Sequence, residues 1–225
     1  MSRRSFAVIG LGRFGSATAT TLAELGQDVI GIDHDEENVR RMADLLTYAV
    51  QLDATDEKAL RRAGIQDVDV AVISIGENVE ASLLIVMTVK ELGIKEVIAK
   101  ATTPLHGRIL EKLGVSRVVF PEREMAIRVA HSLAVRNALD FIELSRDFSM
   151  IEMKAPGEFV DKSLLELELR PRMGLTLVAI KRTTEGQGET INVSPPANER
   201  ILEDDVLVLL GSNVSLAKLD RLTKK

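Results

Sequence analysis

The chain has 225 residues, 45% of them hydrophobic and 28% charged, which is the composition of a soluble globular protein of one or two domains. Its net charge of −5 offers no basic field for nucleic acid, and the absence of cysteine excludes disulfides and thiolate chemistry. The N-terminal apolar run is too short for a signal peptide, and no other run approaches the ~20 residues of a membrane-spanning helix. These features predict a cytoplasmic protein.

The N-terminal half alternates short apolar runs with amphipathic segments, the pattern of a parallel sheet with crossover helices. The predicted strands are apolar on both faces, as buried parallel strands are, and cover 6–9, 29–32, 48–51, 70–74, 97–100 and 117–120. Helices with an acidic start or a glycine near their end are predicted over 14–25, 35–43, 56–63, 78–92 and 104–113. The predicted fold class is α/β, with a Rossmann-type doubly wound parallel sheet.

A glycine turn, Gly10-Leu11-Gly12-Arg13-Phe14-Gly15, follows the first predicted strand. Gly10 permits the tight turn, Gly12 lets the backbone approach a phosphate, and Gly15 lets the helix pack against the strand. The N–H groups at the helix start attract an anion. Asp33 ends the second strand, where an acid accepts from ribose hydroxyls and disfavours the 2′-phosphate of NADP. The stretch predicts a nucleotide site; the alternative is a Rossmann fold that keeps its glycines only for packing.

Further strand ends are expected at the same edge of the sheet, where ligands bind in open α/β folds. Asp53 follows the third strand and could accept from an adenine amino group. Gly76 follows the fourth and could let adenosine lie close to the backbone. Lys100 ends the fifth and could reach a phosphate. The alternative for each is a solvated loop residue, and for Gly76 a plain turn.

The pattern changes after the sixth strand. Pro121 with the acids Glu122 and Glu124 predicts the start of a long helix. Beyond it, strands are predicted over 148–155, 175–182, 190–194 and 205–212, with short helices over 162–169 and 215–222. Gly186-Gln187-Gly188 is typical of a hairpin turn. We therefore expect a Rossmann nucleotide-binding domain over 1–120, a linker helix over 121–139 and a small α+β domain over 140–225.

The residues for catalysis are missing from this pattern. A dehydrogenase needs a positioned acid or base, often histidine or lysine, and the predicted second domain is small and has no histidine. His34 is expected to be solvated, His106 exposed on the first turn of a helix, and His131 partly buried. The sequence has no Walker lysine motif, nucleophile elbow or metal-ligand constellation. We expect a protein that is not an enzyme; the alternatives are an NAD-dependent oxidoreductase and a regulatory domain of another transporter, such as an antiporter.

Six stretches carry a family resemblance: FAVIGLGRFGSA, VIGIDHDEENV, LDATDEKAL, VISIGENVEASLL, VIAKATTPLHGRILEKLGVSRVVFPEREMA and LRPRMGLTLVAIKR. In this order they resemble the cytoplasmic regulatory subunits of Ktr-type potassium transporters, which consist of RCK N-terminal (TrkA-N) and C-terminal (TrkA-C) domains. The resemblance implies dimers joined into an octameric ring beneath a membrane-embedded potassium-conducting subunit, at the inner face of the membrane. It also implies ATP and ADP as ligands of the Rossmann crevice, with ATP activating, and NAD(H) binding in related members.

The resemblance implies site residues as well. Nucleotide contacts would come from Gly10, Gly12, Arg13, Phe14, Gly15, Asp33, Asp53, Ala54, Ile75, Gly76 and Lys100. Arg13 would reach the nucleotide of the neighbouring subunit, and Glu122 would hold Mg²⁺ or Ca²⁺ near the phosphates; the alternative for Glu122 is an acid that only favours a helix dipole.

A second ligand, cyclic di-AMP, is implied for the C-terminal domain, at Leu164, Leu165, Arg170, Leu177 and Pro195. Thr176 stands where some binders carry Asn, and the alternative is that these leucines form a dimer core. The run SLLIVM in the fourth predicted helix is apolar nearly all round, which favours coverage by another subunit on the side away from the sheet.

Overall fold

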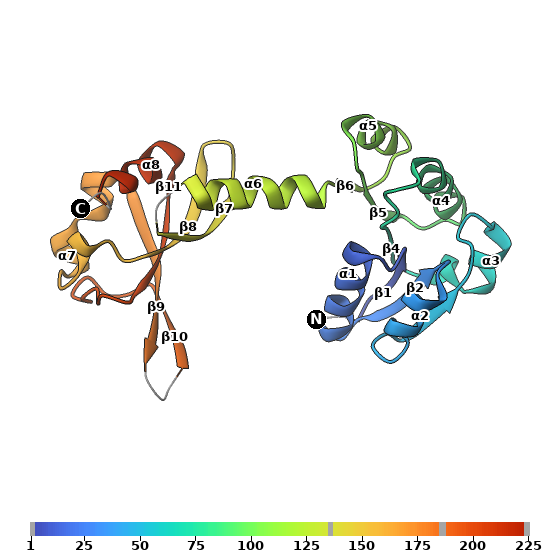
Figure 1. The fold of residues 1–225 in the computed structure, drawn as a ribbon, viewed down its shortest axis with the longest axis horizontal. Helices are drawn as coiled ribbons and strands as arrows, with labels where there is room; N and C mark the ends of the chain where they lie inside the picture. The colour runs from blue at the N-terminus through green and yellow to red at the C-terminus, as the bar shows by residue number, and fades with distance from the viewer. Residues whose placement is uncertain (1–2, 135–136, 185–187, 223–225) are drawn as a thin grey trace. The chain divides into compact units, whose positions relative to one another are not determined.

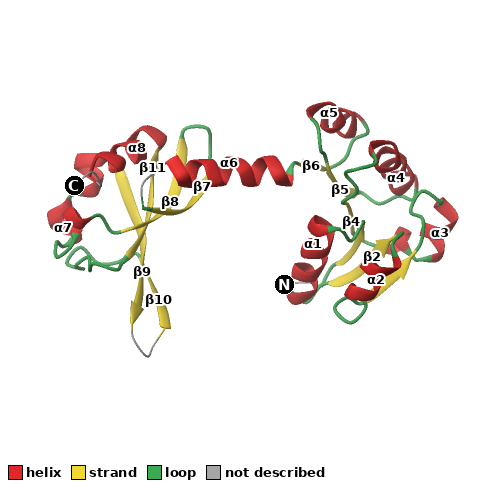
Figure 2. Cartoon of the chain, in the orientation of Figure 1, coloured by secondary structure: helices red, strands yellow, loops and turns green. Residues whose placement is uncertain are grey.

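The computed structural model describes residues 3–134, 137–184 and 188–222. The chain divides into two compact units, Met1–Pro121 and Glu122–Lys225, each with its own sheet and its own hydrophobic core (Figures 1 and 2). Within the described ranges, no helix is long and apolar enough to cross a membrane.

The first unit is built on a parallel sheet in the order β3-β2-β1-β4-β5-β6. Its strands are β1 (Ser5–Ile9), β2 (Asp28–Asp33), β3 (Tyr48–Gln51), β4 (Val70–Ile73), β5 (Glu96–Lys100) and β6 (Arg117–Val119). Every strand lies within one residue of its predicted range at each end. The predicted doubly wound sheet is confirmed, because the strand order reverses between β1 and β4. In folds of this kind ligands bind at the carboxyl ends of the strands where the order reverses.

Helices cover both faces of this sheet. On one face, α1 (Arg13–Glu24) and α2 (Glu36–Met42) pack in a core that contains Val8 of β1. On the other, α3 (Glu57–Arg62), α4 (Val79–Glu91) and α5 (Pro104–Lys112) pack in a core that contains Ala7 and Ile9. The two cores are separate because successive strand residues point to opposite faces.

The second unit contains an antiparallel sheet in the order β10-β9-β11-β8-β7. Its strands are β7 (Ala138–Glu143), β8 (Phe148–Lys154), β9 (Leu175–Thr184), β10 (Gly188–Val193) and β11 (Val206–Ser212). Its helices are α6 (Pro121–Ala134), which begins at the unit boundary, α7 (Leu164–Leu167) and α8 (Asn213–Leu222), with a π-turn, η3 (Leu169–Met173). The predicted small α+β domain is confirmed.

Three details of the second unit differ from the sequence analysis. The described part of α6 ends at Ala134, and β7, which was not predicted, begins at Ala138. His131 is exposed rather than partly buried, and its ring stacks on Phe141 of β7 at 4.3 Å between centroids. Gly186 and Gln187 of the predicted hairpin turn lie outside the described residues; Gly188 opens β10.

The glycine turn gives a test of this packing. A Cβ at Gly15 would overlap the Gly10 carbonyl oxygen and lie 2.7 Å from the Ser74 hydroxyl, so we expect Gly15→Ala to lower the free energy of unfolding by about 1–3 kcal/mol in urea titrations. Helix propensity alone predicts the opposite sign for this substitution. The control is Gly12→Ala, whose Cβ would meet no atom within 4 Å and which should change stability by less than about 1 kcal/mol. Equal stability of the two variants would contradict this packing.

Candidate functional site

The glycine turn joins the end of β1 to the start of α1. Gly10 adopts φ +92°, which favours glycine, and its N–H donates to the Ile32 carbonyl at 2.7 Å. Gly15 packs against Gly10 and Ser74 without room for a side chain. These two glycines are required by the backbone of the protein itself.

Gly12 has no such requirement. Its φ of −66° suits any residue, and the space around an added Cβ is open. It is also the N-cap of α1, where no side chain accepts from the first turn, whereas Asp35, Asp56, Asn78 and Thr103 cap the helices that follow. The uncapped N–H groups of α1 and the open side at Gly12 therefore form a place where an anion can approach closely.

Asp33 links this turn to β2. Its side chain is 5% exposed, and its Oδ2 accepts from the Leu11 N–H at 2.6 Å and from Asn38 Nδ2 at 3.2 Å. Its Oδ1 accepts from the Asp35 N–H at 2.9 Å and lies 3.1 Å from His34 Nδ1. The predicted ribose acceptor is thus also the residue that fixes the position of the glycine turn.

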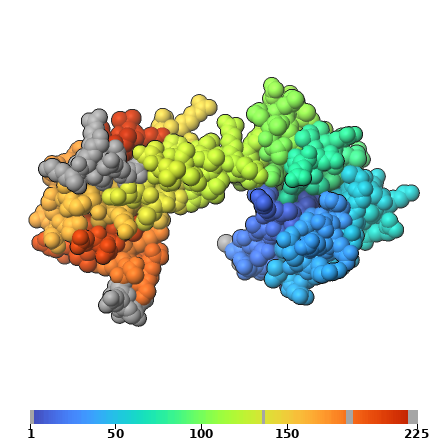
Figure 3. Space-filling model, viewed as in Figure 1, coloured from blue at the N-terminus to red at the C-terminus, as the bar shows by residue number. Residues whose placement is uncertain are grey.

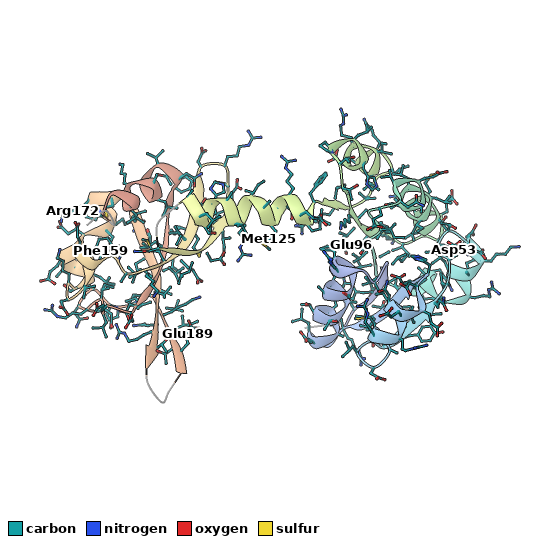
Figure 4. The ribbon with its side chains drawn as sticks, in the orientation of Figure 1. Asp53, Glu96, Met125, Phe159, Arg172 and Glu189 are labelled. Atoms are coloured by element: carbon teal, nitrogen blue, oxygen red, sulfur yellow. The ribbon has the colours of Figure 1, made fainter. Side chains whose placement is uncertain are left out.

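The segment after β3 places Asp53 beside the start of α3 (Figure 4). The Thr55 hydroxyl, at 2.7 Å, and the Thr55 N–H, at 2.9 Å, lower the pKa of Asp53 below its ordinary value, and His34 adds a smaller effect. Asp53 is exposed and stays ionised at neutral pH. Ala54 is buried in the core, so this residue offers only its main chain to a ligand.

The ends of β4 and β5 meet at Gly76. A Cβ there would lie 2.8 Å from the Thr102 methyl group and 3.6 Å from the Lys100 ammonium nitrogen. Ile75 is 3.1 Å from the Cβ position of Gly10, which brings the end of β4 against the turn. Lys100 therefore lies at the predicted edge, and Gly76 has a packing reason within the chain. Phe14 is half-buried against the α1–α2 core, and Arg13 is exposed.

Glu122 lies in the first turn of α6, in the second unit. Among the described residues, no group of three or more His, Cys, Asp or Glu side chains could hold a metal ion. A cation at Glu122 would thus need further oxygen ligands, such as phosphates or groups of another subunit.

In the second unit, main-chain hydrogen bonds bring together segments far apart in sequence. The N–H groups of Leu164 and Leu165 donate to the carbonyls of Glu199 and Ala197 at 3.0 and 2.8 Å. The Ser194 N–H donates to the Val178 carbonyl at 2.9 Å. Because of these bonds, α7 lies beside the segment that follows Pro195, and that segment begins next to β9.

The side chains of the five predicted residues in this unit differ in exposure. Leu165 is 70% exposed, whereas Leu164 and Leu177 pack against the core. Pro195 is half-buried, and Arg170 is exposed in η3.

The expectation of an exposed His106 was wrong. The residue is 1% exposed, its two ring nitrogens have no hydrogen-bond partner among the described residues, and burial lowers its pKa below the ordinary value. Its spacing of four residues from the buried Leu110 places both on one face of α5, and this signal was present in the sequence.

Sequence reasoning also missed two residues that hold the site carboxylates, Asn38 for Asp33 and Thr55 for Asp53. The Thr55 contact follows from the common turn in which an aspartate accepts from the residue two positions on. The Asn38 contact has no comparable local signature, because it depends on how α2 begins.

Residues 6–121 match the family model of the TrkA-N domain, and residues 148–224 match that of the TrkA-C domain. The chain is 38% identical over 219 residues to the Ktr system potassium uptake protein C of Bacillus subtilis (strain 168), covering 97% of each chain. It is 35% identical over 220 residues to the Ktr system potassium uptake protein A of the same organism, covering 98% of this chain and 97% of that protein. The crystal structure of the GsuK RCK domain aligns with all of this chain and 48% of its own, at TM-score 0.66 and 20% identity, which shows the fold.

The hydrogen bonds at Asp53 predict a measurable titration. In Thr55→Val the hydroxyl donor is lost and the main-chain donor remains, so the pKa of Asp53 should rise toward its ordinary value without fully reaching it. Carboxyl ¹³C NMR across an acid titration measures this shift. Asp69, whose pKa is lowered by the main-chain N–H and hydroxyl of Ser5, serves as the internal control and should not move. An unshifted Asp53 would mean that the Thr55 hydroxyl does not hold it.

Proposed function

The chain belongs to the TrkA-N/TrkA-C family of Ktr potassium uptake proteins, and on this premise we propose that it is the nucleotide-sensing regulatory subunit of a potassium uptake transporter. The observation that carries the proposal is the uncapped, open start of α1 at Gly12, held in place by Asp33. An adenine nucleotide fits this arrangement, with phosphates at the helix N-terminus and ribose hydroxyls at the carboxylate.

The proposed ligands are ATP and ADP, with NAD(H) as a further ligand of the same crevice. Contacts would come from the glycine turn, Asp33, Asp53, the main chain of Ala54, Ile75, Gly76 and Lys100. Arg13 is exposed, which suits its proposed reach to the nucleotide of a neighbouring subunit. We assign sensing to residues 1–120, a linking role to 121–139, and a second regulatory domain to 140–225.

The proposed role is regulatory and not catalytic. His106 is buried with a lowered pKa, so it is neutral and lies away from solvent. The Asp33 carboxylate accepts hydrogen bonds from Leu11, Asp35 and Asn38, which suits a binding role. These features support binding without hydride transfer, against the alternative of an oxidoreductase.

Exposed apolar side chains support a homo-oligomer. On α4, Leu84 and Met87 are exposed although the opposite side of the helix is buried against the sheet. On α6, Met125, Val129 and Leu133 are exposed; Figure 4 labels Met125, and Figure 3 shows this helix, yellow-green, at the surface. Two apolar faces on one chain suit the proposed dimers joined into an octameric ring. The ring would lie in the cytoplasm under a membrane-embedded potassium-conducting subunit.

We propose cyclic di-AMP as the ligand of the second unit. The hydrogen bonds of α7 to the segment after Pro195 support this proposal, with the exposed Leu165 to flank adenine and Arg170 to offer a cation for a phosphate. Thr176 in place of Asn leaves the dimer core of the same leucines as the competing explanation.

The ribose contact can be tested with Asp33→Asn, which keeps an oxygen for the Leu11 N–H but removes the charge. We expect ATP and ADP affinities to fall about tenfold or more in calorimetry, because hydrogen bonds to a charged group contribute about 1.5–3 kcal/mol. The matched control is Asp35→Asn, which removes the same charge two residues away while it retains a side-chain cap for α2. Unchanged affinity in Asp33→Asn would remove Asp33 from the site.

The cation role can be tested with Glu122→Gln. This variant should bind nucleotide but lose activation by Mg²⁺ or Ca²⁺ in the presence of ATP, because hard cations prefer carboxylate oxygens. The measurement is potassium flux in vesicles that contain the membrane subunit. Glu124→Gln, on the same first turn, is the matched control and should retain activation. If Glu122→Gln keeps full cation dependence, Glu122 only favours the helix dipole.

A further inference from the structure

The Asp33 carboxylate accepts three hydrogen bonds from its own chain. Two donors are main-chain N–H groups, of Leu11 to Oδ2 and of Asp35 to Oδ1. The third is the side chain of Asn38, with Nδ2 at 3.2 Å from Oδ2, and His34 Nδ1 lies 3.1 Å from Oδ1. Oδ2 already accepts two hydrogen bonds, so a ribose hydroxyl that approaches Oδ2 has to replace one of its donors.

These contacts of Asp33 differ in how they can be released. The two N–H groups belong to the glycine turn and the cap of α2 and are fixed by the fold. The His34 side chain is 87% exposed, so water competes for its contact with Oδ1. Asn38 is half-buried on α2, and its amide oxygen accepts from the Arg41 guanidinium.

The Arg41 contact fixes the orientation of the Asn38 amide. A guanidinium only donates, so the oxygen of Asn38 has to face Arg41 and the NH₂ group has to face Asp33. Asn38 is thus held at both ends, as a donor to the carboxylate and as an acceptor from the next turn of the same helix.

We propose that Asn38 occupies the ribose-hydroxyl position on Asp33 in the nucleotide-free protein and is displaced when a nucleotide binds. This inference rests on the proposed function, in which Asp33 is the ribose acceptor. Replacing one hydrogen bond by another yields less net free energy than filling an unpaired acceptor. Asn38 therefore lowers the affinity for every ligand that carries ribose hydroxyls, and its release also frees the Arg41 guanidinium.

The test measures the affinities of Asn38→Ala and of the wild type for ATP and for 2′,3′-dideoxy-ATP by calorimetry. The affinity of the nucleotide that binds more weakly is measured by competition with the other. We expect the ATP affinity of the variant to rise about threefold or more, because the competing donor is gone. The dideoxy nucleotide has no hydroxyl to place on Asp33, so its affinity should not change. Asn38→Leu, similar in size and without a donor, should give the same pattern.

Each other outcome has a distinct meaning. An unchanged or lower ATP affinity in both variants overturns the proposal, as does an equal gain for both ligands, which a purely structural effect on α2 would give. Thermal unfolding of each variant verifies that it is folded. If the wild type binds ATP no more tightly than the dideoxy nucleotide, the ribose contact of the proposed function fails, and this inference fails with it.

Discussion

The hydrogen bond from the Leu11 N–H to the Asp33 carboxylate joins the glycine turn after β1 to the end of β2. The same stretch of β2 accepts from the Gly10 N–H at Ile32 and from the Leu52 N–H at Asp33. The ends of β1 and β3 are therefore both tied to the end of β2. Because the segment is buried, its polar groups have to be paired, and the position of the turn follows from that requirement. The open start of α1 depends on it directly, since α1 begins inside the turn.

Local signals in the sequence were enough to predict most of this arrangement. The strands of the first unit are apolar on both faces, and Gly10 and Gly15 stand where the backbone requires them. The signals failed where contact between distant segments decides the structure. Only Phe141 of β7 is buried, so the strand lacks an alternating pattern and is defined by its pairing with β8. The contact between Asn38 and Asp33 is local in sequence, but it depends on where α2 begins, and no side-chain motif specifies that contact.

The second unit depends on contacts that are long-range in sequence. The Leu164 N–H donates to the Glu199 carbonyl, and Ser163 forms an isolated antiparallel β-bridge with Arg200. A segment more than thirty residues later in the chain therefore positions α7. The same segment is held by Arg182, which donates to the Arg200 carbonyl at 3.1 Å. Arg182 also donates two hydrogen bonds of 2.7 and 2.8 Å to Asp205, whose side chain is fully buried. A buried carboxylate of this kind has to keep its partner, because an unpaired charge in the interior is costly. The proposed second site therefore depends on the Arg182–Asp205 ion pair, which no local sequence motif predicts.

In the proposed binding mode, the adenosine half of the site cannot distinguish ATP from ADP. Asp33 would contact groups that the two ligands share, and a ligand shifts a conformational equilibrium only through contacts that differ between states. The affinity of the site for a nucleotide and the conformational response to that nucleotide are then set by different groups. The response has to come from groups near the terminal phosphate, for which the proposal names Arg13 and Glu122. Glu122 lies in the first turn of α6, so in the proposed mode a phosphate contact there would act on the helix with which the second unit starts.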